Sequence, residues 1–183
     1  MQERSELEKN INARSNERAG LDNNQSNQYL TFITAGEEYG VDILCVQEIR
    51  GWEAVTPLPN SPPHLKGVIN LRGNIVPIID LRQCFGLEEV EYTSITVVIV
   101  LRLDDGNTEK TVGIVVDGVS DVYTLNEDDM RAAPDMGSNL DTTFVKALVS
   151  INDKLIILLN VDRLFGLTDL KNISLPNQQS LSS

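Results

Sequence analysis

The stretch Thr93-Ser-Ile-Thr-Val-Val-Ile-Val-Leu-Arg-Leu103 is β-branched almost throughout, which is typical of a buried strand. It ends at Asp104-Asp-Gly-Asn107, a sequence that favours a tight turn. Thr111-Val-Gly-Ile-Val-Val116 then has the composition of a second strand that returns along the first. The middle of the chain therefore predicts a β-hairpin.

Further strands are predicted on both sides of this hairpin, where short apolar or alternating runs meet turn residues. These strands cover Tyr29–Thr34, Tyr39–Ile43, Ile75–Ile79 and Leu155–Leu159. Pro77 predicts that its strand lies at a sheet edge or beside a bulge. Helix is limited to brief turns closed by glycine, Asp80–Phe85 and Asp162–Phe165. Short strands at this density indicate a mainly β protein of sandwich or barrel architecture.

An internal repeat is visible when the chain is compared with itself. Three pairs of segments align in the same order: Tyr29–Ile33 with Thr96–Val100, Tyr39–Ile49 with Val112–Val122, and Asn74–Leu87 with Lys154–Leu167. Buried strands can look alike by chance, because Val, Ile and Leu replace one another there. The shared Phe-Gly-Leu endings and the common order favour a real duplication. It predicts two similar lobes, over residues 28–92 and 93–169.

Composition excludes several classes of partner. The 183 residues carry 27 acidic and 15 basic side chains, for a net charge of −12, and Lys and Arg do not cluster. A nucleic-acid binder would present a basic face, so nucleic acid and anionic membrane are not expected as partners. The first residues lack the apolar centre of a signal peptide, and no apolar run is long enough to insert into a membrane. We therefore expect a cytoplasmic location, with flexible polar tails over residues 1–27 and 171–183.

Candidate chemistry is sparse. The single histidine, His64, lies in a Pro-rich loop that is a poor setting for a catalytic base. Paired acidic residues such as Glu37-Glu38 and Asp128-Asp129 fall in turns, and no phosphate-binding glycine motif is present. Two isolated cysteines and one histidine are too few for a structural zinc site. We expect no catalysis, no metal and no cofactor.

The segment Gly67-Val-Ile-Asn-Leu-Arg-Gly73 places two glycines around an apolar strand that ends in one cation. Glycine in such a strand suggests a bulge or the close approach of another backbone. Arg72 is either an ordinary surface charge or an interface anchor, since its guanidinium offers a rigid fork of five donors. Glu48 is the most attractive acidic partner for it within the same lobe.

Five motifs in order resemble the CheW-like domain family of chemotaxis coupling proteins. The motifs are Glu37–Leu44, Val46–Gly51, Lys66–Gly73, Val76–Arg82 and Gly113–Val122, and the resemblance covers about residues 28–170. It implies one CheW-like domain made of two similar five-stranded, SH3-like β-barrel lobes. It also implies an adaptor, or scaffold, that joins the cytoplasmic tip of methyl-accepting chemotaxis receptors to the regulatory domain of the histidine kinase CheA. Such a protein is recruited to membrane-associated receptor arrays.

Site residues are carried over from the family by motif. The resemblance implies a receptor surface around the groove between the lobes, and the matching positions are Val46, Glu48, Gly67, Val68, Arg72, Val97, Val119 and Val122. For contact with the kinase it implies Arg131 and Met136, in a segment that matches the family less well. The N-terminal tail and the Asp104–Lys110 hairpin are longer than the family minimum, and the sequence gives neither a role.

Other functions stay open at this stage. A ligand-binding β-barrel would use the same groove for a small molecule, and a hydrolase would depend on His64. A coupling protein of a related array that does not control motility cannot be separated from a chemotaxis protein by sequence.

Overall fold

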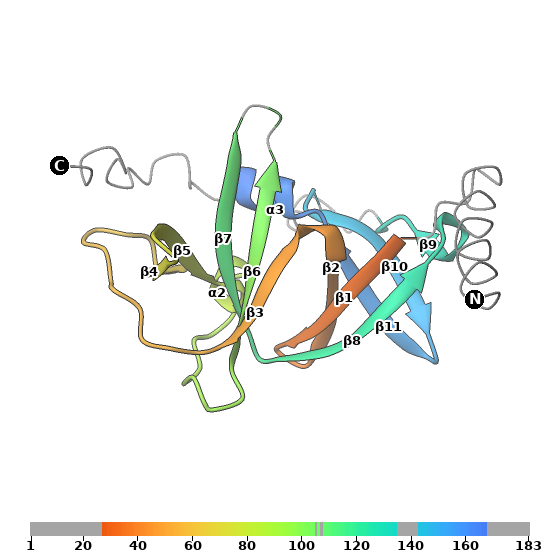
Figure 1. Ribbon diagram of the computed structural model, residues 1–183. Helices are drawn as coiled ribbons and strands as arrows, with labels where there is room; N and C mark the ends of the chain where they lie inside the picture. The colour runs from red at the N-terminus through yellow and green to blue at the C-terminus, as the bar shows by residue number, and fades with distance from the viewer. Residues whose placement is uncertain (1–26, 105, 107, 135–142, 168–183) are drawn as a thin grey trace, which may run out of the picture.

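The computed structural model describes residues 27–104, 106, 108–134 and 143–167. Within them the chain forms two β-sheets with a few short helical turns (Figure 1). The strands are β1 (Asn27–Thr34), β2 (Glu37–Asp42), β3 (Val46–Gly51), β4 (Leu65–Leu71), β5 (Asn74–Asp80), β6 (Val97–Asp104), β7 (Glu109–Val116), β8 (Gly118–Leu125), β9 (Met130–Arg131), β10 (Val145–Ile151) and β11 (Lys154–Leu159). The helical turns are η1 (Ile43–Cys45), α2 (Leu81–Cys84), η2 (Glu127–Asp129) and α3 (Val161–Leu167).

The first sheet has five strands in the order β3-β6-β7-β5-β4, and the second has six in the order β8-β1-β2-β11-β10-β9. All strand pairs are antiparallel except β5 with β7 and β2 with β11. The mainly β fold in two lobes is therefore confirmed. The second sheet exceeds the predicted five strands because the two-residue β9 pairs with β10.

The predicted boundary between the lobes, at residues 92 and 93, is wrong. The hairpin β1–β2 belongs to the same sheet as β8–β11, while the hairpin β6–β7 belongs to the sheet of β3–β5. Each half of the chain thus gives its first hairpin to the other half. Sequence repeats do not reveal such an exchange, because both arrangements bury the same apolar faces.

The duplication itself is supported by the topology. If β1 and β2 correspond to β6 and β7, and β3, β4 and β5 to β8, β10 and β11, both sheets have the same strand order. The parallel pairs agree residue by residue, since Gly113 lies opposite Ile78 and Gly40 opposite Leu158. A Cβ atom on Gly113 would lie 2.5 Å from Ile78 Cδ1, and one on Gly40 would lie 2.8 Å from Leu158 Cδ2. A side chain at this position would crowd the residue opposite in both copies, so both favour glycine there for the same reason.

Three hydrophobic clusters hold the fold. One lies within the five-stranded sheet and includes Val76, Ile78 and Val100, and one lies within the six-stranded sheet around Tyr29 and Leu158. The largest takes side chains from both sheets. It is crossed by a series of aromatic rings, in which Phe32 contacts Tyr39, Tyr39 contacts Phe85, and Phe85 contacts Phe144 at centroid distances of 6.1, 5.2 and 5.3 Å. The two lobes thus share one core.

Several local predictions are confirmed. The helical turns α2 and α3 fall where the sequence places them, although α3 continues through Gly166, which was expected to close it. The Asp80 side chain caps α2 by accepting the Arg82 amide at 2.9 Å. Pro77 is not at an edge, because β5 lies between β7 and β4. It does lie beside a bulge, since the register with β4 shifts between Leu65 and Gly67.

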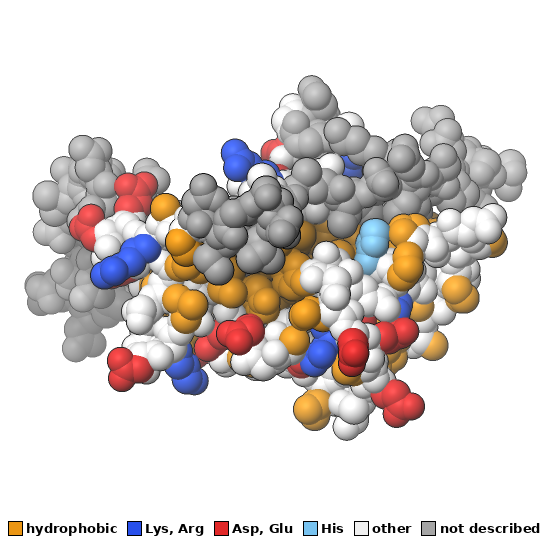
Figure 2. All heavy atoms as spheres, turned by 180° about the vertical axis from the view of Figure 1, so that it is seen from behind, with side chains coloured by type: hydrophobic (Ala, Val, Ile, Leu, Met, Phe, Trp, Pro, Cys, Tyr) orange, Lys and Arg blue, Asp and Glu red, His pale blue; other side chains and the backbone are white. Residues whose placement is uncertain are grey.

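The polar tails predicted over residues 1–27 and 171–183 lie outside the described residues, except for Asn27, which begins β1. Among the described helices, none is long and apolar enough to cross a membrane. On the face shown in Figure 2, the described Lys and Arg side chains are scattered among acidic ones. This face presents no basic patch.

Candidate functional site

The candidate site begins with the turn that joins β4 to β5. It consists of Arg72 and Gly73, with φ angles of 50° and 88°, as expected for the two central residues of a type I′ hairpin turn. The Gly73 amide donates to Asn70 Oδ1 at 2.9 Å. Arginine is an unfavourable residue at positive φ, which Asn and Gly adopt far more easily. The turn therefore holds a cation at a position where the backbone prefers another residue.

Arg72 and Glu48 form the pair that the sequence predicts. Arg72 Nη2 donates to Glu48 Oε2 at 2.9 Å, and the side chains are 77% and 23% exposed. Glu48 belongs to β3, at the opposite edge of the five-stranded sheet from β4. The ion pair therefore brings the two edges of this sheet together. An exposed pair of this kind contributes only about 0–1 kcal/mol to stability.

The Glu48 carboxylate is shared with a second cation. Arg50 Nη1 lies 3.5 Å from Glu48 Oε1, and Arg50 Nη2 lies 2.7 Å from Glu53 Oε1. Charges of alternating sign thus run from Glu53 through Arg50 and Glu48 to Arg72. The series limits how the Glu48 carboxylate can turn, and so it limits the position of the Arg72 guanidinium.

A second link, between β4 and the segment that follows β3, is made by backbone. The Thr56 amide donates to the Val68 carbonyl, and the Val68 amide to the Thr56 carbonyl, both at 2.9 Å. Gly67 has a φ of 150°, and a Cβ atom there would overlap the Thr56 carbonyl. The predicted role of this glycine, a bulge and the close approach of another backbone, is confirmed.

The remaining valines of the predicted receptor surface lie on both sheets. Val46 and Val97 are half-buried on the five-stranded sheet and pack against the shared core. Val119 and Val122 lie on β8, the edge strand of the other sheet, and are 38% and 42% exposed. The structure therefore brings Glu48 into contact with Arg72, and places Val119 and Val122 on a separate strand.

The predicted kinase contacts are only partly described. Arg131 is exposed on β9, where it pairs with Leu148 at the far edge of the six-stranded sheet from β8. Met136 lies outside the described residues.

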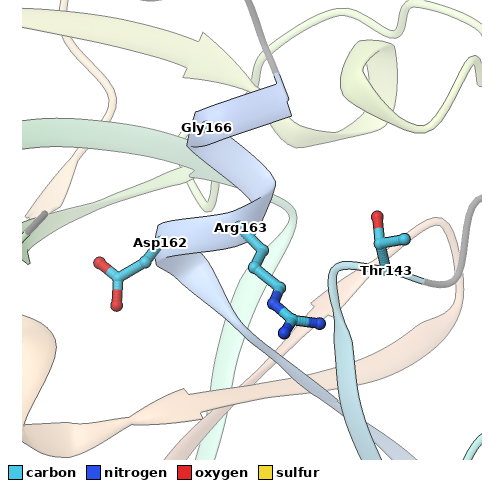
Figure 3. Close-up of a pocket in the computed structure, with 4 residues that line it drawn as sticks. All are labelled: Thr143, Asp162, Arg163 and Gly166. Carbon is cyan, nitrogen blue, oxygen red and sulfur yellow. The ribbon is translucent and has the colours of Figure 1, made fainter.

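Other parts of the described chain offer little chemistry. No group of three or more His, Cys, Asp or Glu side chains that could hold a metal ion occurs among the described residues. Burial, together with the Asp80 carboxylate, raises the pKa of the Cys84 thiol to about 12. A hollow beside α3 is lined by Thr143, Asp162, Arg163 and Gly166. Figure 3 shows the Asp162 side chain pointing away from the side on which Arg163 extends toward Thr143, so these polar groups do not converge on one point.

Two features of this surface escaped the sequence analysis. Leu44 and Ile49 are apolar, yet they are 76% and 47% exposed beside Val46. Arg82 forms a bidentate ion pair with Asp117, with Nη2 2.6 Å from Oδ2. Both residues belong to motifs quoted above, but nothing in the sequence links positions 35 residues apart.

Together, the fold and the site define a class of protein: a two-sheet β domain that presents an anchored arginine at one sheet edge and exposed valines at another. The chain belongs to the CheW-like domain family, whose model matches residues 28–168. It is 46% identical to the chemotaxis protein CheW of Klebsiella aerogenes over 139 residues, which are 76% of this chain and 81% of that protein. It is 34% identical to the chemotaxis protein CheW of Rhizobium meliloti over 142 residues, 78% of this chain and 89% of that protein.

A solved structure agrees with the fold. The scaffolding protein TtCheW from Thermoanaerobacter tengcongensis superposes with a TM-score of 0.70 at 30% sequence identity. The match covers 79% of this chain and 95% of that one. The resemblance read from the five motifs is thereby confirmed at the level of family and fold.

Proposed function

We propose that the chain is a chemotaxis adaptor that couples the cytoplasmic tip of a methyl-accepting receptor to the regulatory domain of the kinase CheA. Membership of the CheW family supports the adaptor role. The observation that carries the receptor half of the proposal is the Arg72 guanidinium, presented on a strained turn and tied to Glu48.

Arg72 suits an interface anchor for two reasons. A non-glycine residue in a left-handed turn is retained against a conformational cost, which is a common mark of a functional position. The side chain is 77% exposed and bonds through Nη2 to Glu48, so most of it is accessible to a partner. A planar fork of donors held by one bond can receive carboxylate or carbonyl oxygens of a partner.

The valines would supply the apolar part of the same interface. Val119 and Val122 are exposed on β8, and Val46, Val68 and Val97 are half-buried on the other sheet. Interfaces commonly combine a few anchors with surrounding apolar contacts that exclude water. We therefore place the receptor surface across the junction of the two sheets, with Arg72 and Glu48 on one side and β8 on the other.

The kinase half of the proposal places CheA at β9, near Arg131, and it extends to Met136. In this proposal receptor and kinase bind at the same time, the receptor at Val119 and Val122 of β8 and the kinase at Arg131 of β9. Holding both partners on one small domain raises the effective concentration of one for the other. Receptor signals reach the kinase when the two receptor states bind this assembly with different free energies. In this proposal the chain works in the cytoplasm and is recruited to receptor arrays at the membrane.

The test is a pull-down with a receptor fragment and with CheA. Arg72→Glu should abolish receptor binding and leave CheA binding intact, because the reversed charge faces Glu48 and the partner. Adding Glu48→Arg restores an ion pair within the chain but leaves the wrong charge toward the receptor, so receptor binding should stay lost. Normal receptor binding by a folded Arg72→Glu variant would contradict the assignment.

A further inference from the structure

The chain passes between the two sheets at Asp117, the single residue between β7 and β8. Figure 1 shows β7 of one sheet running directly into β8 of the other. The Asp117 amide donates to the Ile33 carbonyl at 2.9 Å. Its carboxylate accepts the Ala35 amide at 2.9 Å, in the turn between β1 and β2. Asp117 is thus fixed to the six-stranded sheet by two hydrogen bonds, one from its backbone amide and one to its carboxylate.

Arg82 holds the same carboxylate from the other sheet. It lies on α2, directly after β5, and donates from Nε to Asp117 Oδ1 at 3.1 Å and from Nη2 to Oδ2 at 2.6 Å. The side chains of Arg82 and Asp117 are 19% and 33% exposed, so water screens this pair less than it screens Arg72 and Glu48. A bidentate fork of this kind fixes direction as well as distance. Three elements, namely α2, the β1–β2 turn and the start of β8, therefore meet at one carboxylate.

The equivalent crossover in the other repeat has no such pair. In the alignment of the repeats, Asp117 corresponds to Leu44 of η1, and Arg82 corresponds to Asp162 of α3. Leu44 is 76% exposed, and the Asp162 carboxylate accepts the Asp104 amide at 3.4 Å. The fold can thus make this crossing without an ion pair, so the pair at Asp117 is not a requirement of the duplicated architecture.

Strand β8 begins at this junction. It is an edge strand bonded to β1 alone, and the register of that pairing shifts between Leu30 and Phe32. Thr31 fills the irregularity by bonding the Asp121 backbone through its hydroxyl, at 3.1 and 3.2 Å. Val119 and Val122 lie two and five residues beyond Asp117. A small rotation at Asp117 would therefore move both valines relative to the five-stranded sheet.

We propose that the Asp117–Arg82 ion pair is a positioning device that sets β8 against the five-stranded sheet, so that Val119 and Val122 meet a receptor together with Arg72. This inference rests on the proposed function, because it assumes that the receptor contacts both sheets. Neither Asp117 nor Arg82 needs to touch the receptor. Loss of the pair should weaken receptor binding, while CheA binding at β9, within a single sheet, should be unaffected.

The variants are chosen to separate position from folding. Asp117→Asn keeps an oxygen that can accept the Ala35 amide but loses the charge and one arm of the fork. Arg82→Gln removes the fork from the other side, and Arg82→Lys keeps the charge without it. The matched control is Arg102→Gln, which removes the 3.9 Å pair of Arg102 with Glu109; these residues lie on β6 and β7 of one sheet.

The first measurement is affinity of the full chain for a receptor fragment and, separately, for CheA. We expect Asp117→Asn and Arg82→Gln each to weaken receptor binding about tenfold, with the double variant no weaker than either. Arg82→Lys should give a smaller loss, and CheA affinity should stay within about twofold throughout. Arg102→Gln should change neither affinity. Unchanged receptor affinity in both single variants, or equal losses for receptor and CheA, would overturn the inference.

The second measurement does not depend on any partner. Trp52, the single tryptophan, packs on Tyr92 at a centroid distance of 4.2 Å beside the five-stranded sheet. An acceptor dye on Ser120→Cys of β8, in a Cys45→Ser background, reports the distance between the sheets by energy transfer. The distance distribution should widen in Asp117→Asn and not in Arg102→Gln, and an unchanged distribution contradicts the inference. If the unaltered chain does not bind the receptor fragment while this distance still responds, the proposed function fails and the positioning of β8 stands.

Discussion

Arg72→Asn is predicted to keep or improve the stability of the protein and to remove receptor binding. The native arginine occupies a left-handed position, with φ of 50°, in the turn Arg72-Gly73. Asn tolerates this conformation, and Asn-Gly is the preferred sequence of a type I′ turn. A single change therefore relieves backbone strain and deletes the guanidinium that we assign to the receptor.

Arg72→Asn changes the stability of the folded chain in two opposite ways. Relief of the left-handed arginine contributes about 1 kcal/mol. Loss of the exposed pair with Glu48 costs about 0–1 kcal/mol. The free energy of unfolding of the variant should therefore equal that of the native chain or exceed it by up to about 1 kcal/mol. For binding, an arginine anchor contributes at least about 2 kcal/mol, so receptor affinity should fall by about 30-fold or more.

Stability is measured by urea unfolding followed through Trp52 fluorescence, and affinity by titration of a receptor fragment. Asp153→Gly is the matched control, because Asn152 and Asp153 form the corresponding turn of the other repeat with φ of 49° and 63°. It should unfold within about 1 kcal/mol of the native chain, because Gly fits the turn but adds freedom to the unfolded chain, and it should bind the receptor normally. A loss of more than about 3 kcal/mol in Arg72→Asn would refute the account of the turn, and unchanged affinity would refute the account of the anchor.

Three further predictions follow from the local geometry. Gly67→Ala should lower the free energy of unfolding by about 2–3 kcal/mol, because its Cβ atom would overlap the Thr56 carbonyl. Gly51→Ala is the control, since no atom lies within 4 Å of the added Cβ. Equal urea midpoints for the two variants would contradict the reasoning. Burial opposes ionisation of Asp117, but hydrogen bonds from Arg82 and the Ala35 amide hold its pKa below the ordinary value of 3.8. Because the folded-state pKa of Asp117 is lowered, the stability that its carboxylate adds is present above about pH 4 and is lost as the pH falls through the folded value. The difference in free energy of unfolding between the native chain and Asp117→Asn should therefore be constant from pH 5 to 8 and shrink below pH 4. A difference that grows in acid would contradict this linkage. Burial raises the pKa of Cys84 to about 12, so its thiol should resist alkylation at pH 8 in the folded chain and react in urea. Mass spectrometry of the labelled peptides measures both reactions. Rapid labelling of Cys84 in the native state would contradict its burial.

Local features of the fold were predictable from sequence, and partners in space were not. The hairpins, the Gly67 bulge and the turns after Asp80 and Asn160 follow from residue types that permit few backbone conformations. The exchange of hairpins between the repeats cannot be predicted in this way, because β1 and β6 have similar apolar patterns and either sheet could accept them. Which sheet each hairpin joins is decided by long-range packing in the shared core, where Phe32 and Ile99 are both fully buried.

The same division applies to the candidate site. The pairing of Arg72 with Glu48 could be inferred, because few opposite charges were available nearby in one repeat. The pairing of Arg82 with Asp117 could not, since it depends on the crossover that joins the sheets. Leu44 and Ile49 are exposed on η1 and an edge strand, where a hydrophobic pattern alone does not reveal which face has a neighbour.

The most direct test of the coupling role is CheA activity in a mixture of receptor fragment, kinase and this chain, with co-sedimentation of the three measured in parallel. The native chain should bring CheA into the receptor pellet and raise its activity, and Arg72→Asn should do neither while remaining folded. Kinase activity that does not depend on the chain, or that Arg72→Asn supports as well as the native protein does, would contradict the account.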